Sequence, residues 1–304
     1  MSCIKEISRV FKNAEAISFD DSSKCVLMSD CHRGDGNWGD NFAKNQNIAF
    51  RALSYYYDKG YTYFELGDGD ELWENRSLEE IKEIHSNMFW LLSKFYSKKR
   101  LYLIYGNHDM VKKDDKYLKD HMYTMYDTKK REKLPMFPDV KVHEGLILYY
   151  KPTKDKILLL HGHQGDYFNS KLWKLSRTLV RYLWRPLELF GVNDPSRSAK
   201  NYKKRDIVER NLSNWSSDEK KMIIAGHTHR PVFPEPGNIA YFNDGSCVHP
   251  RCITAIEISG GSITLVKWAV RVREDAILAV EREVLEGPVR LTAYFEKLKE
   301  NKQS

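Results

Sequence analysis

Most histidines of this chain follow short apolar segments, and this arrangement constrains the fold more than any other feature. The segments have the length and composition of buried strands. They are Lys24–Ser29, Tyr61–Leu66, Leu101–Tyr105, Ile157–Leu160 and Met222–Ala225. Six of the ten histidines come just after them: His32, His108, His161, His163, His227 and His229. Because loops at the carboxyl ends of strands converge in α/β proteins, we expect these side chains to meet in one place.

Helical periodicity between the first strands predicts an α/β fold. Asn41–Lys59 and Ser77–Lys99 carry apolar residues at the spacing of amphipathic helices. Strands that alternate with helices indicate a layered core. Three strands then follow one another, Ile239–Asn243, Cys252–Ile258 and Ile263–Arg271, with a hairpin turn at Gly260-Gly261. Gly287-Pro288 predicts another turn before a closing helix, and the whole pattern predicts two packed sheets flanked by helices.

Residues 165–215 interrupt this pattern and are interpreted as a helical cap inserted into a core of residues 1–164 and 216–304. The cap contains 11 Lys or Arg residues and 5 Asp or Glu residues. Its segment Leu172–Phe190 is amphipathic. The apolar side is formed by Trp173, Leu179, Leu183, Trp184, Leu187 and Phe190, with Arg177, Arg181 and Arg185 beside it. Such a side packs on the core in most proteins; the alternative is that it binds a lipid-linked substrate or an acidic membrane surface.

Composition excludes several classes of protein. A hydrophobic fraction of 41% and a charged fraction of 30% are those of a globular domain and argue against disorder. The N-terminal residues do not resemble a secretory signal, and no apolar run reaches the ~20 residues of a membrane-spanning helix, so we expect a cytoplasmic protein. The five cysteines form no CxxC pair and predict free thiols. The net charge of +7 favours anionic partners such as phosphates.

The residues after the strands are those that bind transition metals. Asp30 and His32 stand two positions apart, so in extended backbone both side chains face the same way. Asp68 follows the next strand, and Gly106-Asn107-His108-Asp109 follows the third. Two His-x-His pairs complete the set, His161 with His163 and His227 with His229. Each motif alone has an ordinary explanation as a turn or a cap, but five of them at strand ends point to a metal centre.

In this order the motifs D-x-H, G-D-x-x-E, G-N-H-D, H-G-H and G-H-T-H resemble the calcineurin-like metallophosphoesterase superfamily, from about Val26 to Ser246. The resemblance implies an α/β metallophosphoesterase sandwich. It also implies that Asp30, His32 and His229 bind one ion, that Asn107, His161 and His227 bind a second, and that Asp68 bridges both. His108 would assist catalysis, steadied by Glu71. Whether His161 or His163 is the ligand stays open; the strand end favours His161 and leaves His163 near the substrate.

Ligands of this kind suit Mn²⁺, with Fe²⁺ or Zn²⁺ as alternatives, better than Ca²⁺, which prefers oxygen alone. Two such ions can share a hydroxide that attacks phosphorus in line, because metal binding lowers the pKa of water to about 7. His108 would protonate the leaving oxygen or stabilise its charge. Arg33 and Arg230, each next to a ligand, are expected to hold phosphate oxygens; the alternative is that both are solvated surface charges.

The segment from Gly67 to Trp73 resembles the UDP-2,3-diacylglucosamine diphosphatase branch, which has a helical insertion at the same place. The resemblance implies a nucleotide- or lipid-linked diphosphate as substrate and a peripheral position at the inner membrane face. Arg33-Gly34-Asp35-Gly36 and His163 depart from that branch, so a paralogue with another diphosphate substrate fits equally well. Two further alternatives are a phosphodiesterase or nuclease, for which the basic cap would grip nucleic acid, and a non-catalytic scaffold on the same fold. The sequence does not define an oligomeric state.

Overall fold

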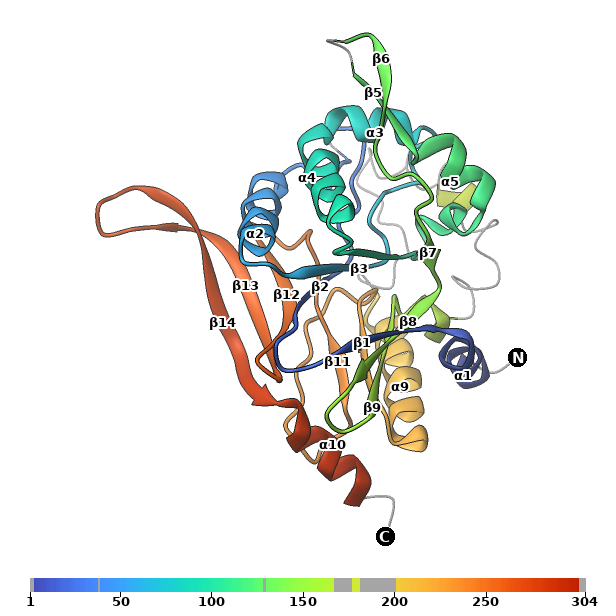
Figure 1. Ribbon diagram of the computed structural model, residues 1–304, viewed down its shortest axis with the longest axis vertical. Helices are drawn as coiled ribbons and strands as arrows, with labels where there is room; N and C mark the ends of the chain where they lie inside the picture. Colours follow the sequence, from blue (N-terminus) through green and yellow to red (C-terminus); the bar gives the residue numbers. More distant parts are fainter. Residues whose placement is uncertain (1–2, 38, 128–129, 167–176, 181–200, 301–304) are drawn as a thin grey trace.

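The computed structural model describes residues 3–37, 39–127, 130–166, 177–180 and 201–300. These form two large sheets packed against each other, with helices on both outer faces (Figure 1). The expected α/β sandwich is therefore confirmed. Among the described residues no helix is both long and apolar enough to span a bilayer.

The larger sheet has seven strands in the order β14-β13-β12-β2-β3-β4-β7. They are β14 (Leu278–Arg290), β13 (Ser262–Val272), β12 (Cys252–Ser259), β2 (Lys24–Met28), β3 (Thr62–Leu66), β4 (Leu101–Ile104) and β7 (Val142–His143). The strands β2, β3, β4 and β7 are parallel, in a register that pairs Val26 with Tyr63 and Tyr63 with Leu101. The carboxyl ends of β2, β3 and β4 therefore lie at one edge of the sheet.

The smaller sheet has five strands in the order β1-β8-β9-β10-β11. They are β1 (Glu15–Phe19), β8 (Gly145–Tyr150), β9 (Asp155–Leu160), β10 (Met222–Ala225) and β11 (Tyr241–Asn243). The neighbours β9, β10 and β11 are parallel. A separate hairpin is formed by β5 (Thr124–Asp127) and β6 (Glu132–Pro135).

Apolar side chains hold the layers together in three clusters. One lies between the sheets and includes Leu27, Leu159 and Phe242. A second lies under α2 (Gln46–Asp58), α3 (Leu78–Ile84) and α4 (Ser86–Ser97), which cover the larger sheet. The third lies under α1 (Cys3–Asn13) and α9 (Tyr202–Glu219), which cover the smaller sheet. Two further α-helices are α5 (Asp115–His121) and α10 (Leu291–Glu300).

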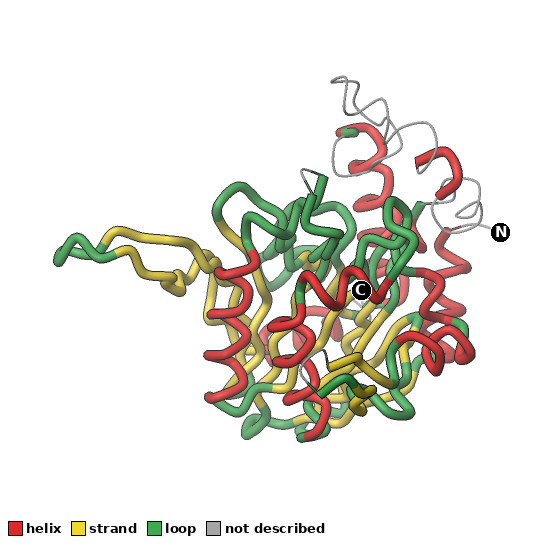
Figure 2. The backbone as a smooth tube through the Cα atoms, turned by 90° about the horizontal axis from the view of Figure 1, so that it is seen from above, coloured by secondary structure: helices red, strands yellow, loops and turns green. Residues whose placement is uncertain are grey.

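Two element boundaries differ from the sequence predictions. The helix expected over Ser77–Lys99 is divided into α3 and α4 at His85. The ring of His85 is hydrogen-bonded to the side chains of Asp40 and Gln46. The turn expected at Gly287-Pro288 is absent, because β14 continues through this cis peptide bond to Arg290. Figure 2 shows the ribbon of β13 and β14 extending from the body of the protein.

The predicted cap falls mostly outside the described residues. Of the apolar side of Leu172–Phe190 only Leu179 is described, and of the three adjacent arginines only Arg177. The predicted boundary at residue 215 lies inside α9. Val208, Leu212 and Trp215 of this helix pack on the smaller sheet, so the second half of α9 is part of the core.

Candidate metal centre

The residues expected as ligands stand at the carboxyl ends of strands from both sheets. Asp30 and His32 follow β2, Asp68 follows β3 and Asn107 follows β4, all in the larger sheet. The smaller sheet supplies His161 after β9 and both His227 and His229 after β10. Packing of the two sheets brings these ends together, since the imidazole and carboxylate groups fall into clusters whose atoms lie within 4.8 Å of one another.

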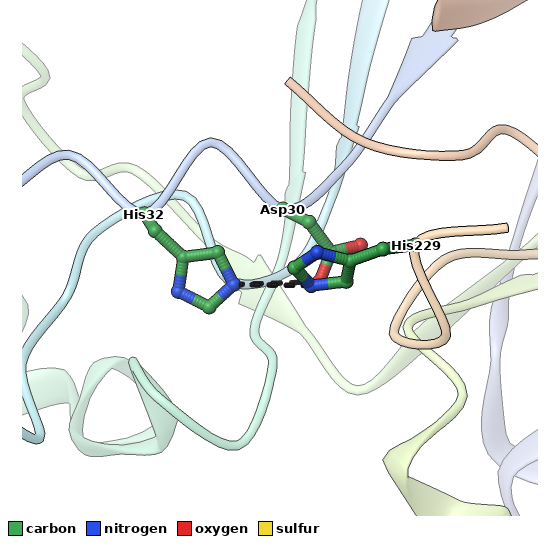
Figure 3. Close-up of side chains that lie close together, drawn as sticks. All are labelled: Asp30, His32 and His229. Atoms are coloured by element: carbon green, nitrogen blue, oxygen red, sulfur yellow. Dashed lines mark hydrogen bonds and ion pairs between the residues drawn. The ribbon is translucent and has the colours of Figure 1, made fainter. Parts of the chain in front are cut away.

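The first cluster contains Asp30, His32 and His229 (Figure 3). The Nε2 atom of His229 lies 3.0 Å from Oδ1 of Asp30, and Nε2 of His32 lies 3.6 Å from the same oxygen. The two Nε2 atoms are 3.4 Å apart. Three ligand atoms therefore converge on one small volume.

The second cluster contains Asp68, His161 and His227. The Nε2 atom of His161 is 3.1 Å from Oδ2 of Asp68. The other ring nitrogen, Nδ1, is 2.8 Å from the backbone oxygen of Leu66, which leaves Nε2 as the ligand atom. Because Oδ2 of Asp68 also lies 3.8 Å from Nε2 of His32, this carboxylate stands between the two clusters.

Four ligand atoms of the described residues are buried with no hydrogen-bond partner outside the cluster. Oδ1 of Asn107 and Nε2 of His227 have no partner, and Oδ1 of Asp30 and Nε2 of His161 lie against other expected ligands, His229 at 3.0 Å and Asp68 at 3.1 Å. Buried polar atoms in native proteins are nearly always bonded, because an unsatisfied one costs about 1–3 kcal/mol. Four such atoms at one place, all of types that bind transition metals, fit a site for divalent cations.

Burial and charge set the protonation of the ligands. Burial alone raises the pKa of Asp68, but the His161 imidazole lowers it well below its usual range. Burial opposes the charged form of His161, yet the carboxylates of Asp68 and Asp30 raise its pKa to about 9. Burial and the neighbouring His161 lower the pKa of His227 to about 4. Asp68 is thus ionised and His227 neutral at pH 7, as ligation requires, whereas His161 keeps a proton that a cation would have to displace.

The ligand backbones adopt a conformation that is rare for side chains other than glycine. The φ angles of Asp30, His32, Asp68, His227 and His229 lie between 48° and 68°. Left-handed residues of this kind cost about 1–3 kcal/mol and cluster at functional sites. The chain therefore turns sharply after three of its strands to direct side chains at the centre, a feature that residue spacing alone did not reveal.

Glycines of the motifs make room for ligands from neighbouring strands. A Cβ atom on Gly106 would lie 2.0 Å from Oδ1 of Asp68, and one on Gly67 would lie 2.7 Å from the ring of His161. Gly67 also has a φ of +94°, which disfavours any other residue. Close packing against His161 and Asp68 therefore explains why glycine occupies the first position of the G-D and G-N motifs.

His108 lies at the side of the cluster and is held by a carboxylate. Its Nδ1 atom is 2.7 Å from Oε1 of Glu71, and the Trp73 ring stacks on it with centroids 4.4 Å apart. The second oxygen of Glu71 is 2.8 Å from Nδ1 of His32. Glu71 therefore orients one histidine expected as a ligand and one expected to act on the substrate.

Comparison with known proteins agrees with this geometry. The family model for the calcineurin-like phosphoesterase matches residues 23–231, more than half of the chain. The chain belongs to the calcineurin-like phosphoesterase family. No curated protein matches it significantly. Among solved structures it is similar to Vps29 of Chaetomium thermophilum, with 12% identity over 87% of this chain and 96% of the other. The TM-score of that comparison is 0.35, too low to support an argument.

Arg33 does not point at the centre of this phosphoesterase. Its guanidinium is buried and bonded to both carboxylate oxygens of Glu65 and to Asp70 at 2.6–2.9 Å. Lys112 joins the same network, 2.6 Å from Asp70 and 2.7 Å from Asp109. This corrects the expectation that Arg33 holds phosphate oxygens, because its donors face carboxylates in the interior.

Arg230 and His163, both expected to bind the substrate, lie outside the two ligand clusters. Arg230 pairs with Glu209 of α9, with Nε 3.1 Å from Oε1, and half of its side chain is exposed. His163 is buried, and its ring centre lies 5.5 Å from that of His161. It belongs to neither cluster, so the geometry favours His161 as the ligand.

Two residues that support Asp30 were not singled out from the sequence. The Oγ atom of Ser29 lies 2.5 Å from Oδ2 of Asp30 and 2.7 Å from Oδ1 of Asp244. The backbone nitrogen of His227 donates to the same Oδ2 atom at 2.8 Å. With Oδ2 occupied, Oδ1 is left for a cation. Asp244 stands in the segment Asn243-Asp244-Gly245-Ser246, at the end of the region that resembles the calcineurin-like superfamily.

Proposed function

We propose that this chain is a two-metal phosphoesterase that hydrolyses a nucleotide- or lipid-linked diphosphate. The observation that carries the catalytic part of the proposal is the set of four buried ligand atoms, at the carboxyl ends of the strands, that have no hydrogen-bond partner outside the metal centre. A scaffold on this fold has no need to keep such atoms, because each destabilises the protein unless a ligand satisfies it.

The ligand sets follow the two clusters. Asp30, His32 and His229 would hold one divalent ion, and Asn107, His161 and His227 the other. Asp68 stands between them and would bind both. When bound, the two ions supply a hydroxide nucleophile at neutral pH and neutralise the phosphoryl oxygens. The mixture of carboxylate, amide and imidazole ligands suits Mn²⁺ first, with Fe²⁺ or Zn²⁺ as alternatives.

His108 is the proposed general acid. Glu71 accepts a hydrogen bond from Nδ1 and fixes the ring, which leaves Nε2 to carry a proton to the leaving oxygen. Trp73, stacked on the same ring, limits its rotation and excludes water from one face. His163, buried next to His161, is proposed to border the substrate.

The diphosphate substrate is proposed from the segment Gly67–Trp73 and its structure. Glu71 and Trp73, the two residues that mark the resemblance to the UDP-2,3-diacylglucosamine diphosphatases, both contact His108. The basic residues of the cap and its apolar side would bind the rest of a lipid-linked substrate and contact a membrane surface peripherally. Most of that segment lies outside the described residues, so this part rests on its sequence.

The test is release of UMP from a UDP-linked acylated glucosamine by the Mn²⁺-loaded protein. Asn107→Ala is the control for contaminating activity, since it removes one ligand atom and leaves the fold. UMP release by the parent and not by the variant supports the diphosphatase. Turnover of bis-p-nitrophenyl phosphate without UMP release supports the metal centre and directs the search to other diphosphates or to nucleic acid.

The scaffold alternative is separated by metal content. Protein incubated with Mn²⁺ and freed of excess ion should retain close to two ions per chain. No retained metal, together with no turnover of either substrate, would leave a binding protein as the remaining explanation.

A further inference from the structure

A second site of concentrated charge lies at the far end of the smaller sheet. A hollow of about 150 Å³ is bordered there by the turn before β9, the turn before β10 and the helix α10, close together in Figure 1. Five lysines line it, Lys154, Lys156, Lys220, Lys221 and Lys299. The only acidic residue of the described lining is Asp155.

The positive charge of this lysine hollow is only partly neutralised. Lys299 pairs with Asp155 at 2.7 Å and Lys221 pairs with Glu219 at 3.4 Å. Lys154, Lys156 and Lys220 form no ion pair within the part of the chain that the structure describes. Like charges held close together repel, so three unpaired ammonium groups at one hollow destabilise the folded chain unless an anion is present.

The backbone that carries these lysines belongs to elements of the core. The hollow has an apolar base in which Met222 and Phe295 are buried. The ammonium groups of Lys156 and Lys221 lie over the ring of Phe11, at 6.0 Å and 5.2 Å from its centre. The lysines are therefore attached to the ends of core elements, and binding of an anion requires side-chain rotation but no change of the backbone.

Two of the lysines stand where glycine or asparagine is the usual residue. Lys154 has a φ of 63° and Lys220, at the end of α9, has a φ of 50°. Left-handed positions in turns favour glycine or asparagine. Lysine gains nothing there in local backbone energy, so a role for its charge explains its presence better than the turn does.

The lysine hollow is separate from the metal centre. Lys156 precedes the buried part of β9 and His161 follows it, and Lys221 and His227 stand in the same relation to β10. At about 3.3 Å per residue, a strand of this length places the two sites roughly 15–20 Å apart at opposite ends. A group bound in the hollow cannot reach the reacting atoms.

We propose that the lysine hollow binds a phosphate group, either of a soluble phosphate or of a lipid headgroup. Its volume accommodates one phosphoryl group with its first ammonium donors. Phosphate oxygens accept charge-assisted hydrogen bonds from several lysines at once, and each lysine acts as a point charge that turns toward the anion. The inference does not depend on the substrate proposed for the metal centre.

The test compares the parent with Lys156→Gln/Lys220→Gln, which removes two of the unpaired charges. Lys98→Gln/Lys116→Gln is the matched control, because both residues are exposed and the charge change is the same. Binding of inorganic phosphate to the full chain is measured by calorimetry at low ionic strength. Any binding at the metal centre is common to the three proteins, so a difference among them reports the hollow. Turnover of bis-p-nitrophenyl phosphate is measured in parallel and should be equal in all three.

The expected result is that the lysine-hollow variant binds phosphate at least about tenfold more weakly than the parent and the control. Co-sedimentation with vesicles of phosphatidylcholine, with and without phosphatidylglycerol, distinguishes the sources. Binding to the anionic vesicles that only the hollow variant loses would assign the site to a headgroup. Equal binding by all three proteins in both assays would overturn the proposal, as would an equal loss in the variant and the control.

Discussion

The carboxylate of Glu71 lies 2.7 Å from Nδ1 of His108 and holds that ring beside the metal cluster. Glu71→Gln keeps the size of the side chain and removes its charge. We expect turnover to fall about 10–100-fold, the usual cost of removing a residue that orients a ligand or an acid. The measurement is kcat on bis-p-nitrophenyl phosphate, together with metal content, because Glu71 also contacts His32.

Glu83→Gln is the matched control for this change, since Glu83 is exposed on α3 and forms no ion pair in the described structure. Unchanged turnover in both variants would show that the Glu71 carboxylate does not orient His108.

His108 is expected to contribute to the chemistry without holding metal. His108→Ala removes the proton donor while Asp68 and the cluster histidines stay in place. Turnover should fall by about 10²–10⁴, the range for one general acid or base. Metal content by mass spectrometry should equal that of the parent. A loss of bound metal would make His108 a ligand and would remove it from the acid role.

The two histidines after β9 should behave differently when each is replaced. Nε2 of His161 lies 3.1 Å from Oδ2 of Asp68 in the second cluster, whereas His163 is outside both clusters. His161→Ala should therefore retain about one metal ion fewer per chain than the parent. His163→Ala should retain the full complement and change KM more than metal content. The reverse pattern would identify His163 as the ligand.

The ligand-bearing strands could be predicted because each is buried on both faces. In β2, Val26 and Met28 pack under the helices while Cys25 and Leu27 pack between the sheets. Such a strand gives an uninterrupted apolar run, which a sequence shows directly. The polar residue that ends each run then stands out, and the D-x-H and H-x-H motifs could be located from spacing alone.

Features that depend on contacts between distant segments could not be predicted. The break at His85 rests on Asp40 and Gln46, which lie about forty residues earlier. The place of Arg33 follows from Glu65 and Asp70 of the neighbouring strand and loop. The position of Arg33 next to the ligand His32 suggested that its side chain faces the substrate. The left-handed backbone at His32 instead directs the Arg33 side chain into the core.

Arg33 is therefore expected to matter for stability and not for substrate binding. Arg33→Gln leaves the Glu65 carboxylate buried without its cation and leaves Asp70 with Lys112 alone. The free energy of unfolding should fall by about 3–5 kcal/mol, as for other broken buried pairs. Arg230→Gln, at a half-exposed pair, should cost less than about 1 kcal/mol. Urea denaturation measures both, and an unchanged stability with a raised KM for Arg33→Gln would restore the phosphate-binding role.

The pair of Asp40 and His85 should make stability depend on pH at the acid end. Burial raises the pKa of Asp40, but the hydrogen bond from His85 at 2.8 Å and the backbone donors Gly36 and Ala43 lower it below its usual value of 3.8. A carboxyl with a depressed pKa stabilises the fold above its unfolded pKa, and this contribution is lost as pH falls through the folded pKa.

Asp40→Asn should accordingly lower the free energy of unfolding by about 1–3 kcal/mol at pH 6. The difference from the parent should shrink as pH falls below about 4, because Asp40 then becomes protonated in the unfolded chain and, at lower pH, in the folded chain. Urea denaturation at a series of pH values in the presence of a chelator measures this difference without a contribution from bound metal. A difference in unfolding free energy that stays constant down to pH 3 would show that the stabilisation by Asp40 does not depend on its charge.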